Sequence, residues 1–239
     1  AADIGTLAAM GRTEVEVFSS PVIGIISTGD ELVPPESDLK PGQIRDVNTP
    51  MLSAAVQQLG AKVISTEIIP DRYELLKASI ENLLPKVDLL LISGGTSVGE
   101  RDNLPLILEE LGQIYVHGVA IKPGKPTIVG TIKDKPVFGL PGNPVAAFFM
   151  FTTLVKPLLY SFRASEIEQH SFEARLTRAV SSNHGREEVI LVWLQADQVT
   201  PVPSKSGLIS SVSRANGYIL VERDQEGLPK GASVNVYLL

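Results

Sequence analysis

The stretch VIGIISTGDEL, residues 22–32, decides the fold. Its first six residues, 22–27, form a run of valine, isoleucine and glycine that ends in serine, with no polar residue at every second position. Such a run is typical of a strand buried on both faces, as in a parallel sheet covered by helices. The polar residues that follow, 28–31, indicate a loop that leaves the carboxyl end of this strand.

Strand and helix patterns alternate downstream of this stretch. Apolar runs predict strands at residues 62–69 and 87–92, and shorter ones at 114–119, 127–132 and 136–140. Helices are predicted from the cap Thr49, with Pro50 in the first turn, to Gly60, and over residues 73–84, 103–111 and 145–160. This alternation predicts an α/β fold, a mostly parallel, doubly wound sheet with helices on both faces.

The pattern changes near residue 165. Only short alternating runs remain, at 172–176, 189–194, 218–222 and 232–238, separated by glycine and proline. They predict a small all-β, barrel-like domain without a helix. Residue 1 is alanine and the chain begins in a helical pattern that stops at Gly11, so we expect a fragment of a longer protein. The expected parts are residues 1–17 as a stub of a preceding region, 18–163 as the α/β domain and 164–239 as the β domain.

Charge and composition narrow the class of protein. The 239 residues carry 21 Lys+Arg against 27 Asp+Glu, a formal net charge of −6. A net-negative chain is not drawn to nucleic acid or to anionic membranes, so we expect neither as a partner. Cysteine is absent, which excludes disulfides and thiolate metal sites and agrees with a cytoplasmic protein. We find no apolar run of the roughly 18 residues that a membrane span needs.

The loops at the carboxyl ends of the strands form the expected ligand site, because ligands of open α/β sheets bind there. Every such loop in this sequence is polar, rich in glycine, or both. In the loop after residues 87–92, glycines let the backbone approach an anion closely, and hydroxyl side chains add donors. These residues are Gly94, Gly95, Thr96, Ser97 and Gly99. Taken alone, the loop would fit an ordinary tight turn equally well.

Other charged and turn residues follow the strands at the same edge. The stretch GLPGNP, residues 139–144, enters a helix N-terminus, which attracts anions. Two lysines lie between prolines in KPGKP, residues 122–126. Three acids on three loops, which suit Mg²⁺ bound together with phosphates, are Glu31, Asp71 and Asp102. A single surface acid is usually only a solvated charge, so the convergence of the loops carries the prediction.

Six motifs occur in one order along the chain: STGDEL (27–32), DVNTPML (46–52), IIPDR (68–72), SGGTSVGERD (93–102), AIKPGKP (120–126) and GLPGNPV (139–145). Together they resemble the MoeA-type molybdopterin molybdotransferases and the related gephyrin E domain. The resemblance covers about residues 15–159, and the β domain resembles the C-terminal domain of that family. The implied fold of the sheet domain is that of the molybdopterin adenylyltransferases.

The resemblance implies an activity and a set of site residues. The enzymes of this family insert molybdenum from molybdate into adenylated molybdopterin and release AMP in a Mg²⁺-dependent step. By motif match, Glu31, Asp71 and Asp102 would be the catalytic acids and the Mg²⁺ ligands. The implied substrate-binding residues are Thr28, Gly29, Asp30, Gly94, Gly95, Thr96, Ser97, Gly99, Lys122, Lys125, Pro141, Gly142, Asn143, Pro144, Arg186 and Ser206.

The resemblance also implies partners and leaves two alternatives. Family members are homodimers with groups from both subunits in the site, so this chain alone is expected to bind without turnover. A molybdopterin adenylyltransferase would be a further partner. One alternative is a competence-damage-type hydrolase of nucleotides or nicotinamide compounds, which generally lacks the KPGKP and PGNP stretches. The other is a non-catalytic scaffold of the gephyrin type, which would need an exposed apolar groove near the β domain to bind a peptide.

Overall fold

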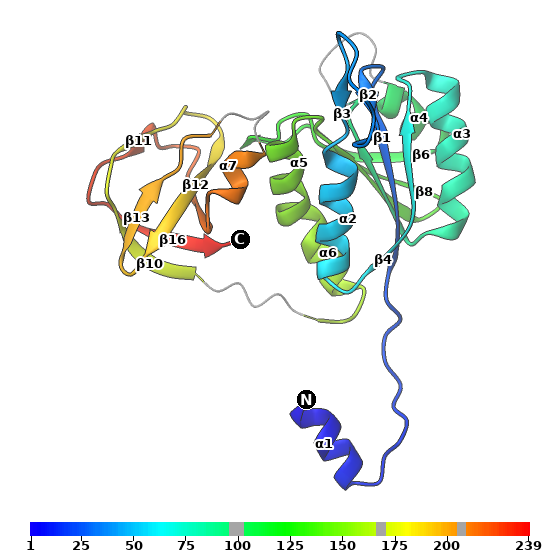
Figure 1. Ribbon diagram of the computed structural model, residues 1–239, viewed down its shortest axis with the longest axis horizontal. Helices are drawn as coiled ribbons and strands as arrows, with labels where there is room; N and C mark the ends of the chain where they lie inside the picture. Colours follow the sequence, from blue (N-terminus) through cyan, green and yellow to red (C-terminus); the bar gives the residue numbers. More distant parts are fainter. Residues whose placement is uncertain (96–102, 166–170, 205–208) are drawn as a thin grey trace.

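The computed structural model describes residues 1–95, 103–165, 171–204 and 209–239. Two lobes lie side by side, and an N-terminal segment extends away from them (Figure 1). Within the described residues, one lobe is a six-stranded sheet with helices on both faces, and the other consists of short strands. The predicted α/β fold with a small barrel-like domain after it is confirmed.

The sheet of the first lobe has the strand order β4-β1-β5-β9-β8-β6. Its strands are β1 (Val22–Thr28), β4 (Lys62–Ile69), β5 (Leu89–Ser93), β6 (Gly112–His117), β8 (Ile128–Ile132) and β9 (Lys135–Leu140). The first four in spatial order, β4, β1, β5 and β9, run parallel, whereas β8 is antiparallel to both of its neighbours. The sheet is therefore mostly parallel, as predicted, with β8 reversed near one edge.

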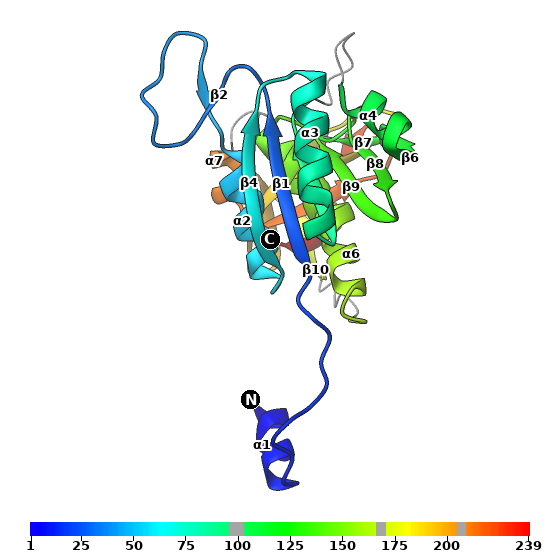
Figure 2. The same cartoon turned by 90° about the vertical axis from the view of Figure 1, so that its right-hand side faces the viewer.

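Helices cover both faces of this sheet (Figures 1 and 2). Those on one face are α2 (Asn48–Gln58), α5 (Pro144–Met150) and α6 (Lys156–Ser161); those on the other are α3 (Tyr73–Leu83) and α4 (Asn103–Leu111). The side chains of β1 alternate between the faces. Ile23 and Ile25 pack with the first group of helices, and Ile26 packs with the second. This double burial explains why the strand is apolar at consecutive positions.

Some local predictions were wrong. Thr49 does not cap α2: the helix begins at Asn48, and the Asp46 carboxylate accepts the backbone N–H groups of Asn48 and Thr49 at 3.0 and 3.1 Å. Asp46 thus satisfies two N–H groups that have no partner within the helix. α4 is followed directly by β6, whose first residue is Gly112.

The predicted helix over 145–160 contains an irregular turn. A π-helical segment, η2 (Phe151–Val155), separates α5 from α6. By length and composition this continuous stretch, Pro144–Ser161, could cross a membrane, with 18 residues and a mean hydropathy of 1.3. The expectation of no apolar run of that length was therefore wrong. The helix instead contributes Val145, Phe149 and Leu159 to the core beneath the sheet, which accounts for its apolar composition.

The second lobe is a closed barrel. Its strands are β10 (Ser171–Leu176), β16 (Ser233–Leu238), β14 (Gly217–Val221), β12 (Glu187–Gln195) and β13 (Gln198–Pro201). In this order each strand pairs with the next, and β13 pairs with both β10 and β12, which closes the ring. Buried residues such as Val192, Ile219 and Val236 fill its interior. A four-residue helix, α7 (Ser210–Ser213), departs from the prediction of a helix-free domain.

The two lobes share packing and hydrogen bonds. The short strand β7 (Ile121–Lys122) comes from the first lobe and pairs in parallel with β12 of the barrel. The rings of Phe149 and Tyr218 meet edge to face with their centroids 5.5 Å apart. Since Val189, Leu191 and Tyr218 belong to the same buried cluster as α5, the barrel is packed directly against the sheet domain.

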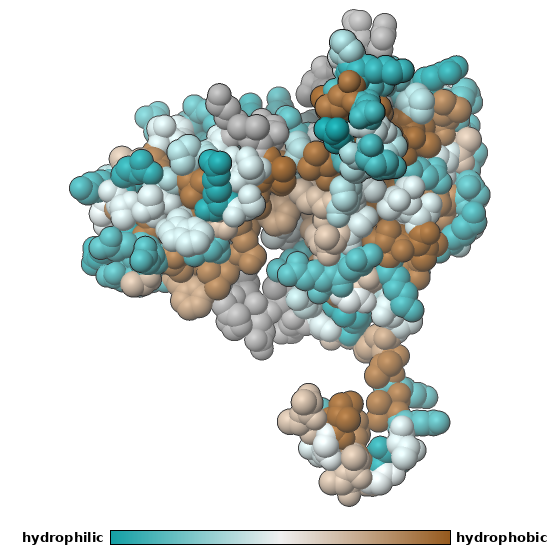
Figure 3. All heavy atoms as spheres, viewed as in Figure 1, coloured by the Kyte–Doolittle hydropathy of each residue, from teal (hydrophilic) through white to brown (hydrophobic). Residues whose placement is uncertain are grey.

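The N-terminal helix α1 (Ala2–Ala9) lies apart from both lobes and is joined to them by an extended segment without secondary structure (Figures 1 and 2). None of its residues is buried. Apolar side chains are exposed along this segment, among them Ile4, Val17 and Phe18. Figure 3 shows brown, hydrophobic surface on this segment. The remaining short elements are η1 (Leu84–Lys86), the pair β2 (Leu32–Val33) and β3 (Ile44–Arg45), and the pair β11 (Val180–Ser181) and β15 (Gly227–Leu228).

Candidate functional site at the carboxyl edge of the sheet

The strand register brings the predicted loops to one edge of the sheet. Ser27 of β1 lies opposite Ser93 of β5, and Ser93 lies opposite Leu140 of β9. Since Gly139 pairs with Ile128 at the start of β8, the loop that holds KPGKP also lies at this edge. The loops after β1, β4, β5 and β9 are therefore neighbours, as the sequence predicted, and the loop before β8 joins them.

Asp71 is held in place by the neighbouring loops. Its Oδ1 accepts a hydrogen bond from Asn103 Nδ2 at 3.2 Å and a long one from Thr28 Oγ1 at 3.5 Å. Its backbone N–H donates to Asp30 Oδ1 at 3.1 Å. Within the described residues, the second oxygen of Asp71 and both carboxylate oxygens of Glu31 accept no hydrogen bond, so these acids can face a ligand.

Gly94 and Gly95 bring the backbone after β5 close to β1. Both have positive φ angles, +93° and +60°. A Cβ on Gly94 would lie 2.2 Å from the carbonyl oxygen of Thr28, and one on Gly95 would lie 3.0 Å from Thr28 Cγ2. The Gly94 N–H donates to the carbonyl of Leu140 at 3.1 Å. Only glycine fits here, and the three neighbouring strand ends are tied together.

Asn48 links two of the strand ends from the N-terminus of α2. Its Nδ2 donates to Ser93 Oγ at 2.7 Å and to the carbonyl oxygen of Gly142 at 2.8 Å. Asn48 is only 7% exposed, and in the described part of the chain its Oδ1 is buried without a hydrogen-bond partner. A buried acceptor without a donor is costly, so the two bonds made by Nδ2 must outweigh this cost.

A buried carboxylate lies next to Asn48. Asp46 is 3% exposed, and its Oδ1 accepts three donors: the Ser27 hydroxyl at 3.1 Å and the N–H groups of Asn48 and Thr49. The Thr49 hydroxyl lies 2.8 Å from Ser27 Oγ. These donors compensate for the burial of the charge. The end of β1 is thereby fixed against the start of α2.

The two lysines of KPGKP differ in their surroundings. Lys122 Nζ forms an ion pair with Glu188 of the barrel at 2.9 Å, and Glu188 also accepts a hydrogen bond from Ser182. Lys125 is exposed. Between them, a Cβ on Gly124 would lie 2.5 Å from the sulfur of Met150, so glycine is needed for this loop to pack against α5. Lys122 is therefore directed to the barrel, and Lys125 is the freer of the two cations.

Beside Asp71, helices α3 and α4 are joined by a charged cluster. The Tyr73 hydroxyl donates to Glu110, and Lys77 Nζ lies 2.5 Å from Glu110 Oε1. The hydrogen bond from Lys77, followed by that from Tyr73, lowers the pKa of Glu110. The same contacts with Glu110 raise the pKa values of Tyr73 and Lys77. The cluster fixes the start of α3, directly after Asp71, against α4.

Residues 24–161, more than half of the chain, match the family profile described as "Probable molybdopterin binding domain". The chain belongs to this molybdopterin-binding family. Residues 173–239 match a second profile, described as "MoeA C-terminal region (domain IV)". The second match favours the MoeA resemblance over the competence-damage alternative, and it confirms the family that the six motifs indicated.

Individual relatives agree with this membership. A molybdopterin biosynthesis MoeA protein from Pyrococcus horikoshii superposes with a TM-score of 0.89 at 41% identity, over 99% of this chain and 59% of that chain. For a molybdenum cofactor biosynthesis protein from Pyrococcus furiosus the TM-score is 0.77 at 28% identity, over 100% of this chain and 75% of that chain. A molybdopterin molybdenumtransferase of Bacillus subtilis is 34% identical over 98% of this chain and 56% of its own length. The chain thus spans a little over half the length of that curated relative.

Several predicted residues of this molybdopterin-binding chain lie outside the described residues: Thr96, Ser97, Gly99, Asp102 and Ser206. Of the others, Pro141 is buried, Gly142 and Asn143 are exposed, and Pro144 begins α5. Arg186 is exposed on the barrel just before β12. The described residues contain no group of three His, Asp or Glu side chains that could hold a metal ion.

Sequence reasoning missed three polar residues at this edge: Asp46, Asn48 and Asn103. The first two lie in the DVNTPML motif, in which Thr49 and Pro50 indicate the start of a helix. A carboxylate and an amide two residues apart, just before a helix, could have indicated side chains that satisfy backbone groups. Nothing in the sequence pairs Asn103 with Asp71, which lies 32 positions earlier.

Proposed function

We propose that this chain provides the molybdopterin-binding part and the C-terminal domain of a molybdenumtransferase. The reaction is insertion of molybdenum from molybdate into adenylated molybdopterin, with release of AMP. The curated relative from Bacillus subtilis is named molybdopterin molybdenumtransferase, and the family match covers the site described above. We assign residues 1–17 to a stub of a preceding region, 18–163 to the molybdopterin-binding domain and 164–239 to the C-terminal domain.

The observation that carries the proposal is the convergence at the carboxyl edge of the sheet. There Thr28 donates to the Asp71 carboxylate, and the Gly94 N–H donates to the carbonyl of Leu140. Asn48 joins Ser93 to the Gly142 turn. The exposed Gly142-Asn143 turn and the helix N-terminus that follows it suit an anionic diphosphate. A site of this form holds a nucleotide-like substrate at several points at once.

Five of the described site residues have a proposed role. Gly94, Gly95 and Gly142 let the diphosphate approach the backbone, and Lys125 attracts molybdate. Asp71, held by Asn103, keeps one oxygen free to face the reacting phosphate.

Mg²⁺ would neutralise the phosphate charge when bound. Carboxylate oxygens are suitable ligands for it, and Glu31 and Asp71 supply them in the described part of the chain. Asp102, the third proposed ligand, lies outside that part.

The proposal extends to partners and location. The family resemblance implies a homodimer for the longer protein and a molybdopterin adenylyltransferase as the source of the adenylated substrate, and we propose a cytoplasmic location. The ion pair between Lys122 and Glu188 and the pairing of β7 with β12 would keep the barrel next to the site.

Titration of the chain with adenylated molybdopterin tests the proposal. With Mg²⁺ present, Asp71→Asn should weaken binding, because it removes a carboxylate that would hold the cation next to the diphosphate. The matched control is Asp134→Asn, an exposed acid in the β8–β9 turn at the opposite edge of the sheet, where asparagine tolerates the positive φ of 62°. Equal behaviour of both variants, or no binding by the unmodified chain, would contradict the proposal.

A further inference from the structure

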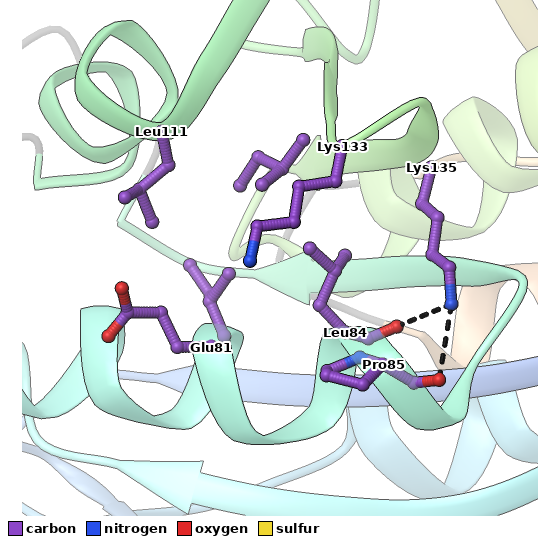
Figure 4. Close-up of a pocket in the computed structure, with 8 residues that line it drawn as sticks. Glu81, Leu84, Pro85, Leu111, Lys133 and Lys135 are labelled. Carbon is purple, nitrogen blue, oxygen red and sulfur yellow. Dashed lines mark hydrogen bonds between the residues drawn. The ribbon is translucent and has the colours of Figure 1, made fainter.

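A pocket of about 270 Å³ lies at the edge of the sheet opposite the proposed site. It is bounded by the end of α3 with η1, by the end of α4, and by the turn that joins β8 to β9 (Figure 4). This turn lies at the amino end of β9, whereas the proposed site lies at its carboxyl end. The pocket is therefore separate from the strand-end loops.

The wall of the pocket is apolar. Ile80, Leu84 and Ile132 belong to the buried cluster between the sheet and α3, and Leu111 packs against that cluster. Ile80, Leu84 and Ile132 are at most 3% exposed and form the floor of the pocket, whereas Leu111 and Pro85 are accessible to a ligand. An apolar cavity of this kind selects ligands with an alkyl or aromatic part.

Two lysines lie above this apolar wall, and they differ. Lys135 Nζ donates to the carbonyl oxygens of Leu84 and Pro85 at 2.9 and 3.2 Å (Figure 4). Its ammonium group is therefore already hydrogen-bonded in η1, at the C-terminal end of α3. Lys133 occupies a turn position with a φ of +50°. Its ammonium group points into the pocket between the apolar side chains (Figure 4). Among the described residues it has no hydrogen-bond or ion-pair partner.

The acid on the rim does not neutralise Lys133. Glu81 lies on α3, and Figure 4 shows its carboxylate directed away from the Lys133 ammonium. The pocket thus combines an apolar wall with one unpaired positive charge. A carboxylate attached to a short apolar chain matches both features, because the chain covers the wall and the carboxylate accepts a charge-assisted hydrogen bond from Lys133.

We propose that this pocket binds a small amphiphilic carboxylate, with its carboxylate on Lys133 and its apolar part against Leu111 and Pro85. The volume of about 270 Å³ lies just below the usual range for small-molecule sites, roughly 300–1,000 Å³, so the ligand is short. The site does not depend on the proposed molybdenum chemistry.

Titration with hexanoate, hexan-1-ol and hexylammonium, followed by calorimetry and by NMR shifts of the backbone amides, tests this site. Hexanoate is expected to bind about tenfold more tightly than hexan-1-ol and to shift the amides around Leu111 and Ile132, whereas hexylammonium is repelled. Lys133→Gln removes the charge and retains a polar side chain, so it should weaken hexanoate binding about tenfold and leave hexan-1-ol binding unchanged. Lys62→Gln, an exposed lysine on the far edge strand β4, is the control and should change nothing.

Because Lys133 is exposed, its substitution should leave the thermal unfolding midpoint unchanged, so lost binding would not reflect lost folding. The inference is overturned if hexanoate does not bind, if hexan-1-ol binds as tightly as hexanoate, or if Lys133→Gln and Lys62→Gln behave alike.

Discussion

Replacing Asn48 by aspartate should destabilise the chain far more than replacing it by alanine. Asn48→Ala removes the two hydrogen bonds to Ser93 and Gly142 but also removes the unpaired Oδ1, for a net loss of about 1–2 kcal/mol. Asn48→Asp places a carboxylate opposite the Gly142 carbonyl and next to the buried Asp46, where the Ser93 hydroxyl alone among its present partners can donate to it. An uncompensated buried charge costs about 3–5 kcal/mol.

The pH dependence of this loss follows from the same contacts. Burial and the neighbouring Asp46 charge raise the pKa of the new carboxyl, because both disfavour its ionised form. The folded variant then binds more protons than the unfolded chain, so its stability falls as the pH rises and recovers as the pH is lowered. At low pH the protonated acid can also donate to the Gly142 carbonyl.

Urea unfolding of the wild type, Asn48→Ala and Asn48→Asp at several pH values measures both effects. Asn143→Asp is the matched control, since Asn143 is exposed at the N-cap of α5, where aspartate is well tolerated. If Asn48→Asp proved as stable as Asn48→Ala at neutral pH, or lost stability on acidification relative to the wild type, the reasoning about this buried network would be refuted.

Three other predictions concern neighbouring residues. Gly94→Ala should lower the free energy of unfolding by at least about 3 kcal/mol, because its Cβ would lie 2.2 Å from the Thr28 carbonyl oxygen. Gly42→Ala, with a φ of +83° and no atom within 4 Å, should lower it by about 1 kcal/mol. Similar losses in thermal unfolding would contradict this prediction. Asn103→Ala should weaken substrate binding about fivefold in a titration by releasing Asp71, and unchanged affinity would show that this bond is unimportant for binding. Because the pKa of Glu110 is lowered, its ionised form stabilises the fold above the ordinary carboxyl pKa, and this stabilisation is lost as the pH falls through the lowered value. Glu110→Gln should therefore flatten the acid side of a curve of unfolding free energy against pH. An unaltered acid side would show that Glu110 does not contribute.

The sequence predicted the sheet well because its strands carry a strong local signal. Double burial makes β1 and β5 apolar at consecutive positions up to the serine and threonine residues at their carboxyl ends. A run of this kind can be identified without knowing its neighbours. The strand 62–69 was predicted with the bounds that β4 has. The reversal of β8 was not predicted, since pairing direction depends on a partner strand that the local pattern does not name.

The candidate site was predictable at the level of loops, and less so at the level of contacts. A glycine such as Gly94 indicates a position where the backbone needs glycine, and in the structure the reason is its close approach to Thr28. Asn48 and Asn103 escaped prediction because their partners, Gly142 and Asp71, are distant in the sequence. Lys122 was expected to line an anion pocket, whereas its nearest charge is Glu188 on a strand of the other lobe.

A structure of this chain with adenylated molybdopterin bound would test the central proposal most directly. We expect the diphosphate to lie at the carboxyl edge of the sheet, between the Gly94-Gly95 backbone, Asp71 and the Gly142 turn. A ligand bound at the barrel or at the opposite edge of the sheet, or no bound ligand at saturating concentration, would contradict it.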